Sequence, residues 1–522
     1  MTSTNRRMTL AAMLLAASVV VSRLLGFLRD AVIAAQLGAS AETDAYHAAF
    51  MLPDLLNYLL SGGALSIAFI PLFTRLTAEG RGDAAWRLFS NVATVAVAVM
   101  TPAIVIAWWA TPAFVGAVYG FEGDQLELTS DLTRIVLIGP LFFILGGLLQ
   151  ATDLARKRFI APAIAPLVYN VCIIAGGLLL APTMGARGFS IGAIVGAALG
   201  PFLVPLISTR DILRFRPHVD LSSAELRHYA KIALPLMFGA SLLFFDEWIG
   251  RTIAAREAEG SITWLNNARR LMLVPVALVG QAIGQAALPF LADLAAQGRE
   301  RDLADTLGRT LRATITLGLA AASALAAASP EITRIVYERG AFTATDTAQT
   351  WPLLAILGAA IAGWSAQIVV SRGYYAREST LRPMLISSTV VALSVPVYVL
   401  LGRAYGLPGL ATATVIGMTL GSGALLEGWR RTWGASLWGA VGQGIAGGLL
   451  VALPAGAAAA GAATLARRTL DSGGTMGALV VFACTAVAWA GIGLPLLLRF
   501  GGPAGDAVRR RLGGLARRLR RA

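Results

Sequence analysis

Apolar stretches long enough to cross a lipid bilayer recur along almost the whole chain. About 30 Å of hydrocarbon requires roughly 20 apolar residues in a helix, and only helices and closed barrels satisfy their backbone hydrogen bonds in lipid. Of the 522 residues, 56% are hydrophobic and only 14% are charged, with a mean hydropathy of +0.69. Soluble domains carry about 25% charged residues. The sequence therefore predicts an all-α polytopic membrane protein.

We expect about fourteen transmembrane helices, with thirteen as the alternative because the span at 188–209 is weakly delimited. Their expected ranges are 10–36, 43–76, 84–119, 128–153, 159–181, 188–209, 226–256, 262–294, 303–337, 348–376, 382–402, 407–430, 436–466 and 475–500. A longer polar segment separates two groups of six spans, which is the layout of a transporter with two halves. The expected domains are an N-terminal lobe (1–209), a cytoplasmic linker (210–228), a C-terminal lobe (229–432), two further helices (433–500) and a basic cytoplasmic tail (501–522).

The loops between the expected spans alternate in charge. Loops 75–87 and 156–158 and the segment 210–227 are rich in arginine, whereas loops 122–127 and 257–259 are acidic. Because basic residues stay preferentially in the cytoplasm, we expect both termini inside and the acidic loops outside. The net charge of +14 is spread over such short clusters. It therefore indicates orientation in a bacterial inner membrane rather than nucleic-acid binding.

Three arginines lie inside expected spans: Arg23 and Arg29 in the first, and Arg270 in the eighth. A charge near the bilayer centre costs roughly 2.5–3.5 kcal/mol on insertion scales, so it faces a bundle interior or a wet cavity. Guanidinium groups bind phosphate oxygens in pairs. We expect the three arginines to converge on an anionic cargo that carries a diphosphate. The alternative is that Arg23 reaches the membrane interface while Arg29 pairs locally with Asp30.

A further concentration of charge lies deep in the seventh span, where Asp246 and Glu247 are adjacent. Successive helical residues point about 100° apart, so the two acids cannot share one partner. We expect one to pair with an arginine and the other to bind the cation that couples energy to transport, with structural ion pairing as the alternative. The sequence holds no metal-binding or catalytic motif, so we expect no metal, no cofactor and no enzymatic activity.

Several segments, in order along spans 1–12, resemble the MurJ/MviN family of lipid II flippases, which belongs to the multidrug/oligosaccharidyl-lipid/polysaccharide exporter superfamily. They are SRLLGFLRD (22–30), LGAS and TDAYHAAFMLPDLL (37–56), GGALSIAFIPLF (62–73), RFIAPAIAPLVYN (158–170), ARRLMLVPVALVGQAIGQAALP (268–289), YERGAFTATDT (337–347) and GYYARESTLRP (373–383). The resemblance implies two six-helix lobes around a central cavity, with two C-terminal helices that form a groove for a lipid tail. It implies a transporter that moves undecaprenyl-diphosphate-linked peptidoglycan precursor (lipid II) from the inner to the outer leaflet by alternating access.

The resemblance also implies residues that bind the cargo. Family arginines important for transport correspond to Arg23, Arg29 and Arg270, and an outer acidic residue corresponds to Asp44. It implies a lipid-linked glycan and membrane lipids as partners, cell-wall synthesis or division proteins as further candidates, and no nucleic acid. We expect a monomer. Membrane potential, sodium and protons are the alternatives for the driving force.

Two positions depart from the family pattern. Asn57 stands where a further cavity arginine is expected, and Gly62 stands where a glutamate is common. We include Asn57 among the cargo-binding residues. The departures leave open a flippase for another polyprenyl-linked polysaccharide unit. A drug or cation antiporter is disfavoured by the arginine-rich interior, and a membrane glycosyltransferase would need a catalytic acidic loop that we do not find.

Overall fold

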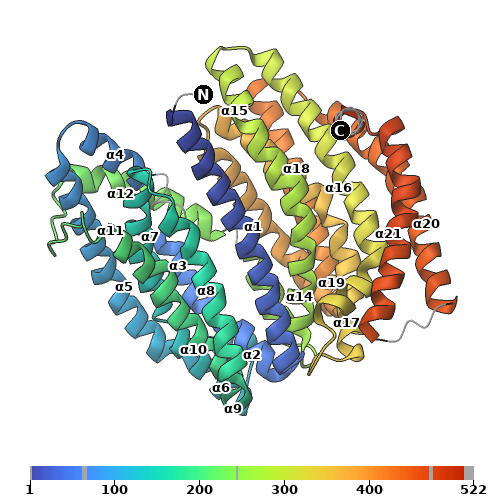
Figure 1. Cartoon of the computed structure of the whole chain (residues 1–522), viewed down its shortest axis with the longest axis horizontal. Coiled ribbons are helices and arrows are strands. Elements are labelled where there is room, and N and C mark those ends of the chain that lie inside the picture. Colours follow the sequence, from blue (N-terminus) through green and yellow to red (C-terminus); the bar gives the residue numbers. More distant parts are fainter. Residues whose placement is uncertain (1–2, 62–67, 243–244, 470–473, 511–522) are drawn as a thin grey trace. The chain divides into compact units, whose positions relative to one another are not determined.

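The computed structural model describes residues 3–61, 68–242, 245–469 and 474–510. Over these residues every regular element is a helix and no strand occurs, which confirms the all-α prediction (Figure 1). The elements are α1 (Ser3–Leu37), α2 (Ala41–Ala49), α3 (Met51–Ser61), α4 (Ile70–Ala78), α5 (Gly82–Tyr119), α6 (Gly123–Val136), α7 (Gly139–Ala155), α8 (Ile160–Leu179), α9 (Ala181–Met184), α10 (Ala186–Ala197), η2 (Ala198–Leu203), α11 (Val204–Thr209), α12 (Ala224–Leu242), α13 (Phe245–Ala254), α14 (Ser261–Val276), η3 (Ala277–Gln281), α15 (Ala282–Ala296), α16 (Glu300–Tyr337), α17 (Ala344–Gly358), α18 (Ala360–Ala376), α19 (Leu381–Trp433), α20 (Trp438–Thr469) and α21 (Gly474–Phe500).

Helix lies within each of the fourteen expected spans, but fewer segments qualify as membrane spans by length and composition. Within the described ranges nine helical segments do so, or ten when α17 and α18, bent by 45°, count as one span. One of the nine is α19, which leaves helical geometry at Gly406 (φ 59°, ψ −138°) and so comprises two helices. A left-handed φ of this kind favours glycine. The total of fourteen stays a prediction.

Some expected spans are interrupted. The second has a turn at Phe50 between α2 and α3, and the fourth has a turn at Leu137 and Ile138 between α6 and α7. The break before α3 has a local cause, because Pro53 is the third residue of that helix, and proline is tolerated in the first turn but not in a helix interior. Two π-helical turns also lie at prolines: η2 contains Pro201, and η3 begins two residues after Pro275.

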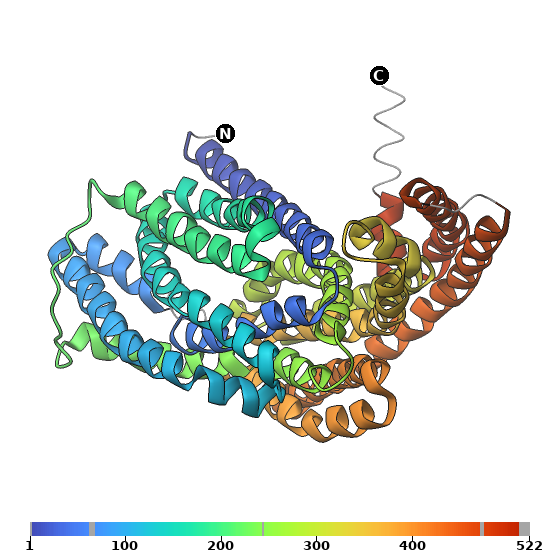
Figure 2. The same cartoon turned by 90° about the horizontal axis from the view of Figure 1, so that it is seen from below.

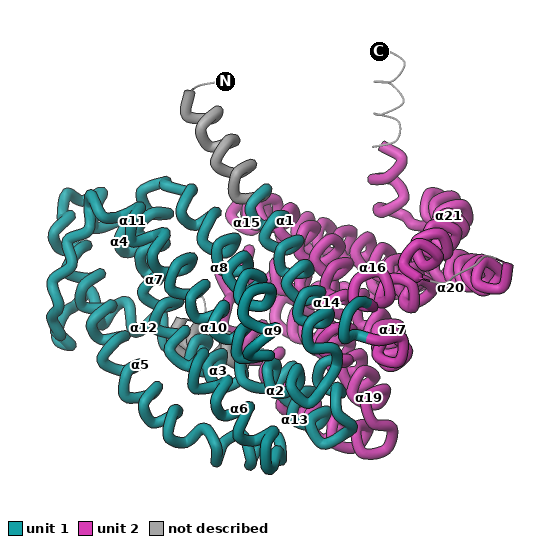
Figure 3. Tube along the Cα trace, turned by 60° about the horizontal axis from the view of Figure 1, so that its bottom comes forward, with its two compact units in different colours: residues 1–263, 339–342 teal, residues 264–338, 343–522 magenta. Residues whose placement is uncertain are grey.

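The chain forms two compact units. Unit 1 consists of Met1–Thr263 with Arg339–Phe342, and unit 2 consists of Trp264–Glu338 with Thr343–Ala522 (Figure 3). Unit 1 thus contains α12 and α13, which the sequence analysis assigns to the C-terminal lobe. The two lobes expected from the sequence are the halves of a transporter, and they are a different division of the chain from these two compact units. The lobe boundary at 210–228 stays a prediction.

Two of the clusters of buried apolar side chains in unit 1 contain several aromatic rings. One gathers aromatic rings of α4, of α5 and of the residue before α4, among them Phe69, Phe73 and Trp86, with the centroid of the Phe73 ring 5.5 Å from that of Trp86. The other surrounds Tyr46 and Phe189. The second cluster packs α1, α8 and α10 together around the polar residues treated below.

Glycines bring α8 and α10 into backbone contact. A Cβ atom added at Gly176 would lie 2.6 Å from the carbonyl oxygen of Gly188, and one at Gly192 would lie 2.7 Å from that of Cys172. No side chain fits at such distances, so the two helices are packed through their backbones, as small residues allow in membranes.

In unit 2, α16 packs against α20 and α21, and α20 lies alongside α21 (Figures 1 and 2). Gly444 and Gly448 of α20 permit the close approach, because a Cβ at either position would touch α16 within 3.1 Å. Large apolar side chains remain exposed on outer helices of both units, such as Leu179 at 75% and Val487 at 71%. Exposed apolar surface on this scale indicates contact with lipid.

Candidate functional site

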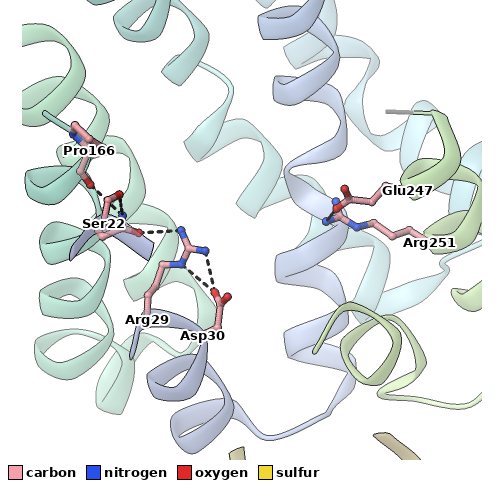
Figure 4. Close-up of polar contacts among 7 residues, drawn as sticks. Ser22, Arg29, Asp30, Pro166, Glu247 and Arg251 are labelled. Carbon is pink, nitrogen blue, oxygen red and sulfur yellow. Dashed lines mark hydrogen bonds and ion pairs between the residues drawn. The ribbon is translucent and has the colours of Figure 1, made fainter. Parts of the chain in front are cut away.

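The best-defined polar site of unit 1 is the guanidinium of Arg29. Its Nε and Nη2 donate to Oδ1 of Asp30 at 3.0 and 2.9 Å, and its Nη1 donates to Oδ1 of Asn170 on α8 at 3.1 Å (Figure 4). Asn170 in turn donates to the carbonyl of Pro166 at 3.0 Å and to Ser22 at 3.5 Å. The side chains of Arg29 and Asp30 are only 17% and 10% exposed. The arginine is therefore buried, paired and held by two helices.

These bonds leave part of the guanidinium available. The group has five N–H donors, and three of them are used by Asp30 and Asn170. One N–H remains on each terminal nitrogen, Nη1 and Nη2. A phosphate group accepts two parallel hydrogen bonds from such a fork.

The pairing of Arg29 with Asp30 is the alternative that the sequence left open. The two residues are neighbours on α1, and the long arginine side chain folds back to reach the carboxylate. Nothing in the residue pattern alone marks Asn170 as a partner of Arg29. Its signal was that it ends the segment RFIAPAIAPLVYN, one of the segments that carry the family resemblance.

The other two arginines lie elsewhere in the fold. Arg23 is exposed on α1, two helical turns before Asp30, within unit 1. Arg270 is half-buried on α14 in unit 2. Their convergence on one space with Arg29 stays a prediction.

Asp44 is buried, at 3% exposure, and its carboxylate is occupied by the chain itself. Oδ2 accepts from the backbone N–H of Gly260 at 2.9 Å, and Oδ1 accepts from the backbone N–H and the hydroxyl of Thr263 at 2.8 and 2.6 Å. A carboxylate is favoured at a helix N-terminus, where backbone N–H groups lack partners. Asp44 thus joins α2 to the first turn of α14, and a role in binding cargo stays a prediction.

Asn57 lines a small cavity of about 90 Å³ inside unit 1. Other lining residues include Asp54 of α3, Phe143 of α7 and Tyr169 of α8. The cavity is bounded by a neutral amide where the family resemblance implies a guanidinium. Gly62, the second departure, lies outside the described residues.

The structure describes only one side chain of the acidic pair in the expected seventh span. Glu247 forms an ion pair with Arg251, one helical turn further along α13 (Figure 4). This accounts for Glu247 as the structural partner of an arginine. The side chain of Asp246 lies outside the described residues. Within the described ranges, no group of three or more His, Cys, Asp or Glu residues could hold a metal ion, and cation coupling by Asp246 and Glu247 stays a prediction.

Loops expected in the cytoplasm contact one another at one end of unit 1. Arg158 forms two hydrogen bonds to Asp211 at 3.1 and 3.0 Å, Arg214 pairs with Asp83 at 2.8 Å, and Arg81 pairs with Glu225 at 2.9 Å. The hydrogen bonds from Arg158 hold the pKa of the Asp211 carboxyl below its ordinary value. Ion pairs therefore tie the segment 210–228 to the loops that precede α5 and α8.

Loops expected outside contact one another at the other end. Glu42 accepts from the backbone N–H of Ala186 at 2.7 Å. Arg187, in the same loop as Ala186, pairs at 2.9 Å with Asp131, which lies at the start of the expected fourth span. The two sets lie at opposite ends because α5 runs for 38 residues between them, from Gly82 to Tyr119.

Comparison with known proteins gives one consistent family. The family model described as "Lipid II flippase MurJ" matches residues 33–481. A Burkholderia cenocepacia protein named "Lipid II flippase MurJ" is 30% identical over 425 residues, which cover 78% of this chain and 81% of the relative. A Rhizobium meliloti protein named "Probable lipid II flippase MurJ" is 28% identical over 432 residues, 80% of each chain.

Two solved structures have a similar fold. The structure titled "Lipid II flippase MurJ, inward closed conformation" aligns with a TM-score of 0.77 at 21% identity, covering 93% of this chain and 99% of that one. An inward-facing multidrug resistance transporter of the MATE family aligns with a TM-score of 0.67 at 12% identity, covering 80% of this chain and 96% of that one. At these identities the likeness is one of fold alone.

The contacts of Asp44 generate a stability prediction. Asp44→Ala leaves three donors without an acceptor, whereas Thr263→Val removes one donor at nearly constant shape. Hydrogen bonds to a charged group contribute about 1.5–3 kcal/mol each, so Asp44→Ala should lower the melting temperature of the purified protein more than Thr263→Val does. The double variant should be no less stable than Asp44→Ala, because the shared bond is already lost. Fully additive losses would contradict this contact.

Proposed function

The chain belongs to the MurJ family, whose model matches residues 33–481, and we propose that it flips a peptidoglycan precursor across the bacterial inner membrane. The cargo is lipid II, a disaccharide peptide on undecaprenyl diphosphate, and the movement is from the inner to the outer leaflet. The family match carries this proposal, since it extends over most of the chain. The multi-pass helical architecture supports a transporter rather than an enzyme.

The diphosphate of the cargo is bound by Arg23, Arg29 and Arg270. Support comes from Arg29, which is buried inside α1 and keeps one N–H on each terminal nitrogen after binding Asp30 and Asn170. Asp30 offsets one positive charge, so an incoming diphosphate competes with this carboxylate for the guanidinium. Asn170 is neutral and keeps the fork oriented without such competition.

Alternating access follows from charge. With the site empty, the positive charges of Arg23, Arg29 and Arg270 repel one another in a medium of low dielectric constant and resist being brought together. A diphosphate relieves this repulsion, so its higher affinity for the closed state drives closure. In this proposal the lobes 1–209 and 229–432 rock about the cargo, and the two helices within 433–500 form a groove for the polyprenyl tail.

A second cargo, another polyprenyl-linked polysaccharide unit, is favoured by one observation. Asn57 lines a cavity of unit 1 together with Asp54, so an amide stands beside this carboxylate where the family resemblance implies a guanidinium. This wall attracts anions less strongly than the family pattern does. The two cargoes share the diphosphate and differ in the attached glycan.

The protein is a multi-pass protein of the inner membrane, and we place both termini and the segment 210–228 in the cytoplasm. The charge pattern of the loops supports this orientation. The ion pairs of unit 1 support it too, because Arg81, Arg158 and Arg214 bind acids of other loops in the cytoplasmic set.

The first functional prediction is that this chain restores growth to cells depleted of their lipid II flippase and that Arg23→Ala, Arg29→Ala and Arg270→Ala do not. A charged hydrogen bond contributes about 1.5–3 kcal/mol, so each loss should reduce transport roughly tenfold to a hundredfold. Arg29→Lys should fail partially, because an ammonium keeps the charge but not the fork. The measurement is growth rescue alongside the amount of folded protein in the membrane.

Arg134→Ala is the matched control. Arg134 also lies inside an expected span, but its guanidinium stacks on the ring of Trp108, 4.6 Å from the centroid. This variant should rescue normally. Normal rescue by all three alanine variants would refute the cationic site. Rescue of cells that lack an exopolysaccharide flippase, but not of cells that lack the lipid II flippase, would establish the second cargo.

The second functional prediction concerns topology. In a background of Cys172→Ala and Cys484→Ala, Asp124→Cys should react with a membrane-impermeant maleimide in intact spheroplasts. Val219→Cys, an exposed position of the segment 210–228, should react only after permeabilisation. The opposite pattern would invert the proposed orientation.

The third functional prediction concerns energy coupling. Asp246→Asn combined with Glu247→Gln should slow transport in vesicles and change its dependence on sodium, protons or membrane potential. Glu247→Gln alone should have the smaller effect on ion dependence, because Glu247 is paired with Arg251. Transport at the normal rate with normal ion dependence in the double variant would make the pair purely structural.

A further inference from the structure

A second polar cavity, of about 260 Å³, lies in unit 2 where α16 and α20 end and α17 and α21 begin. Its wall contains Glu331, Arg334 and Glu338 of α16 and Arg467 of α20. Arg467 lies on α20, one of the two helices proposed to hold the polyprenyl tail, but none of these residues is proposed to bind the diphosphate. Pockets for drug-sized ligands measure about 300–1,000 Å³, so this cavity suits a smaller group such as a lipid headgroup.

The wall of the cavity includes a buried carboxylate, one oxygen of which accepts no hydrogen bond from any described residue. Glu331 is 4% exposed, and its Oε1 accepts from Nε and Nη2 of Arg467 at 2.7 and 2.6 Å. Its Oε2 is buried and accepts no hydrogen bond from any residue that the structure describes. Leaving such an acceptor unsatisfied is costly. The oxygen therefore calls for a ligand that carries N–H or O–H donors.

Donors line the same cavity. The hydroxyl of Thr347, on the first turn of α17, is buried and bonds to no described residue. Arg467 has a half-exposed side chain, and its Nη1 takes no part in the pair with Glu331. An anionic group on the ligand can accept from both. Two arginines and two glutamates make the wall neutral overall, which matches a ligand that carries both charges and no net charge.

The surroundings of the cavity are apolar and exposed. Trp351, at 37% exposure, is part of the wall, and tryptophan is enriched at membrane interfaces. On α21, Leu479 and Val480 stand next to the lining residues Ala478 and Val481 and are 42% and 43% exposed. A headgroup in the cavity would thus leave its acyl chains on an apolar helix surface.

We propose that this cavity binds the headgroup of an ethanolamine phospholipid. In this proposal the side chains of Glu331 and Thr347, which line the cavity, turn toward a bound headgroup. The primary ammonium then donates to Oε2 of Glu331, and the phosphate accepts from Arg467 and Thr347. A choline headgroup carries the same charges but has no N–H, so it cannot satisfy Oε2. A glycerol headgroup adds net negative charge and lacks the ammonium. The lipid would come from the outer leaflet, and this assignment rests on the topology proposed above. The assignment of the headgroup does not depend on that topology.

The test uses the purified full-length protein in detergent, titrated with phosphatidylethanolamine, phosphatidylcholine and phosphatidylglycerol of identical acyl chains. Binding is measured by native mass spectrometry and by the shift in melting temperature. The wild type should bind phosphatidylethanolamine about tenfold more tightly than phosphatidylcholine, the effect expected for one hydrogen bond to a charged group. Glu331→Gln should reduce this ratio to about one.

Thr347→Val provides a second, independent variant. It removes a donor to the phosphate that both lipids share, so it should weaken both and leave their ratio unchanged. Asp302→Asn is the matched control, because Asp302 forms an ion pair with Arg299 at 2.8 Å near the other end of α16. This variant should keep the wild-type ratio. A gel-filtration profile shows that each variant is folded.

Three results would overturn the proposal. One is equal affinity of the wild type for phosphatidylethanolamine and phosphatidylcholine, and another is an unchanged ratio in Glu331→Gln. The third is a preference for phosphatidylglycerol, which would identify an anion site instead. Each result is independent of the rescue experiment, since lipid binding is measured without transport. The flippase proposal can therefore fail while the headgroup site stands, and the reverse.

Discussion

A guanidinium inside a bilayer requires the protein to supply the hydrogen bonds and the counter-charge that water would otherwise provide. For Arg29, Asp30 on the same helix supplies the counter-charge. Asn170 on α8 accepts a further hydrogen bond, which orients the guanidinium. Much of unit 1 serves this arrangement. The aromatic and aliphatic residues around Tyr46 and Phe189 hold α2, α8 and α10 in place, so that Asn170 meets the arginine. The polar site thus depends on apolar packing.

The two ends of unit 1 use polar contacts differently. At the expected cytoplasmic end, exposed side chains form ion pairs between loops, and such pairs contribute little individually. At the other end Asp44 is buried and accepts two hydrogen bonds from backbone N–H groups and one from a hydroxyl. The exposed ion pairs fix the path of the segment 210–228, although each contributes little to the stability of the fold. The buried hydrogen bonds join helices firmly.

Local features were predictable from the sequence, and contacts between distant segments were not. The length of the apolar stretches predicted helix at every expected span. The charge of the loops assigned to the cytoplasmic side the same loops that ion pairs join in unit 1. Hydrophobicity alone did not identify Asn170 as a partner of Arg29, 141 residues earlier, or Thr263 as a partner of Asp44. Nor did it bring Glu331 together with Arg467, because that pair exists only where α16 and α20 end side by side. Helix breaks at Gly406 and before Pro53 follow local rules, but which of many glycines and prolines break a helix depends on packing.

The glycine contacts between α8 and α10 have a mechanical consequence. Backbones that touch at Gly176 and Gly192 leave no layer of side chains that could slide or change rotamer. The two helices must therefore move as one rigid body, and Asn170 travels with them. Strain from a cargo that pulls on Arg29 is then transmitted through its hydrogen bond with Asn170 to both helices at once.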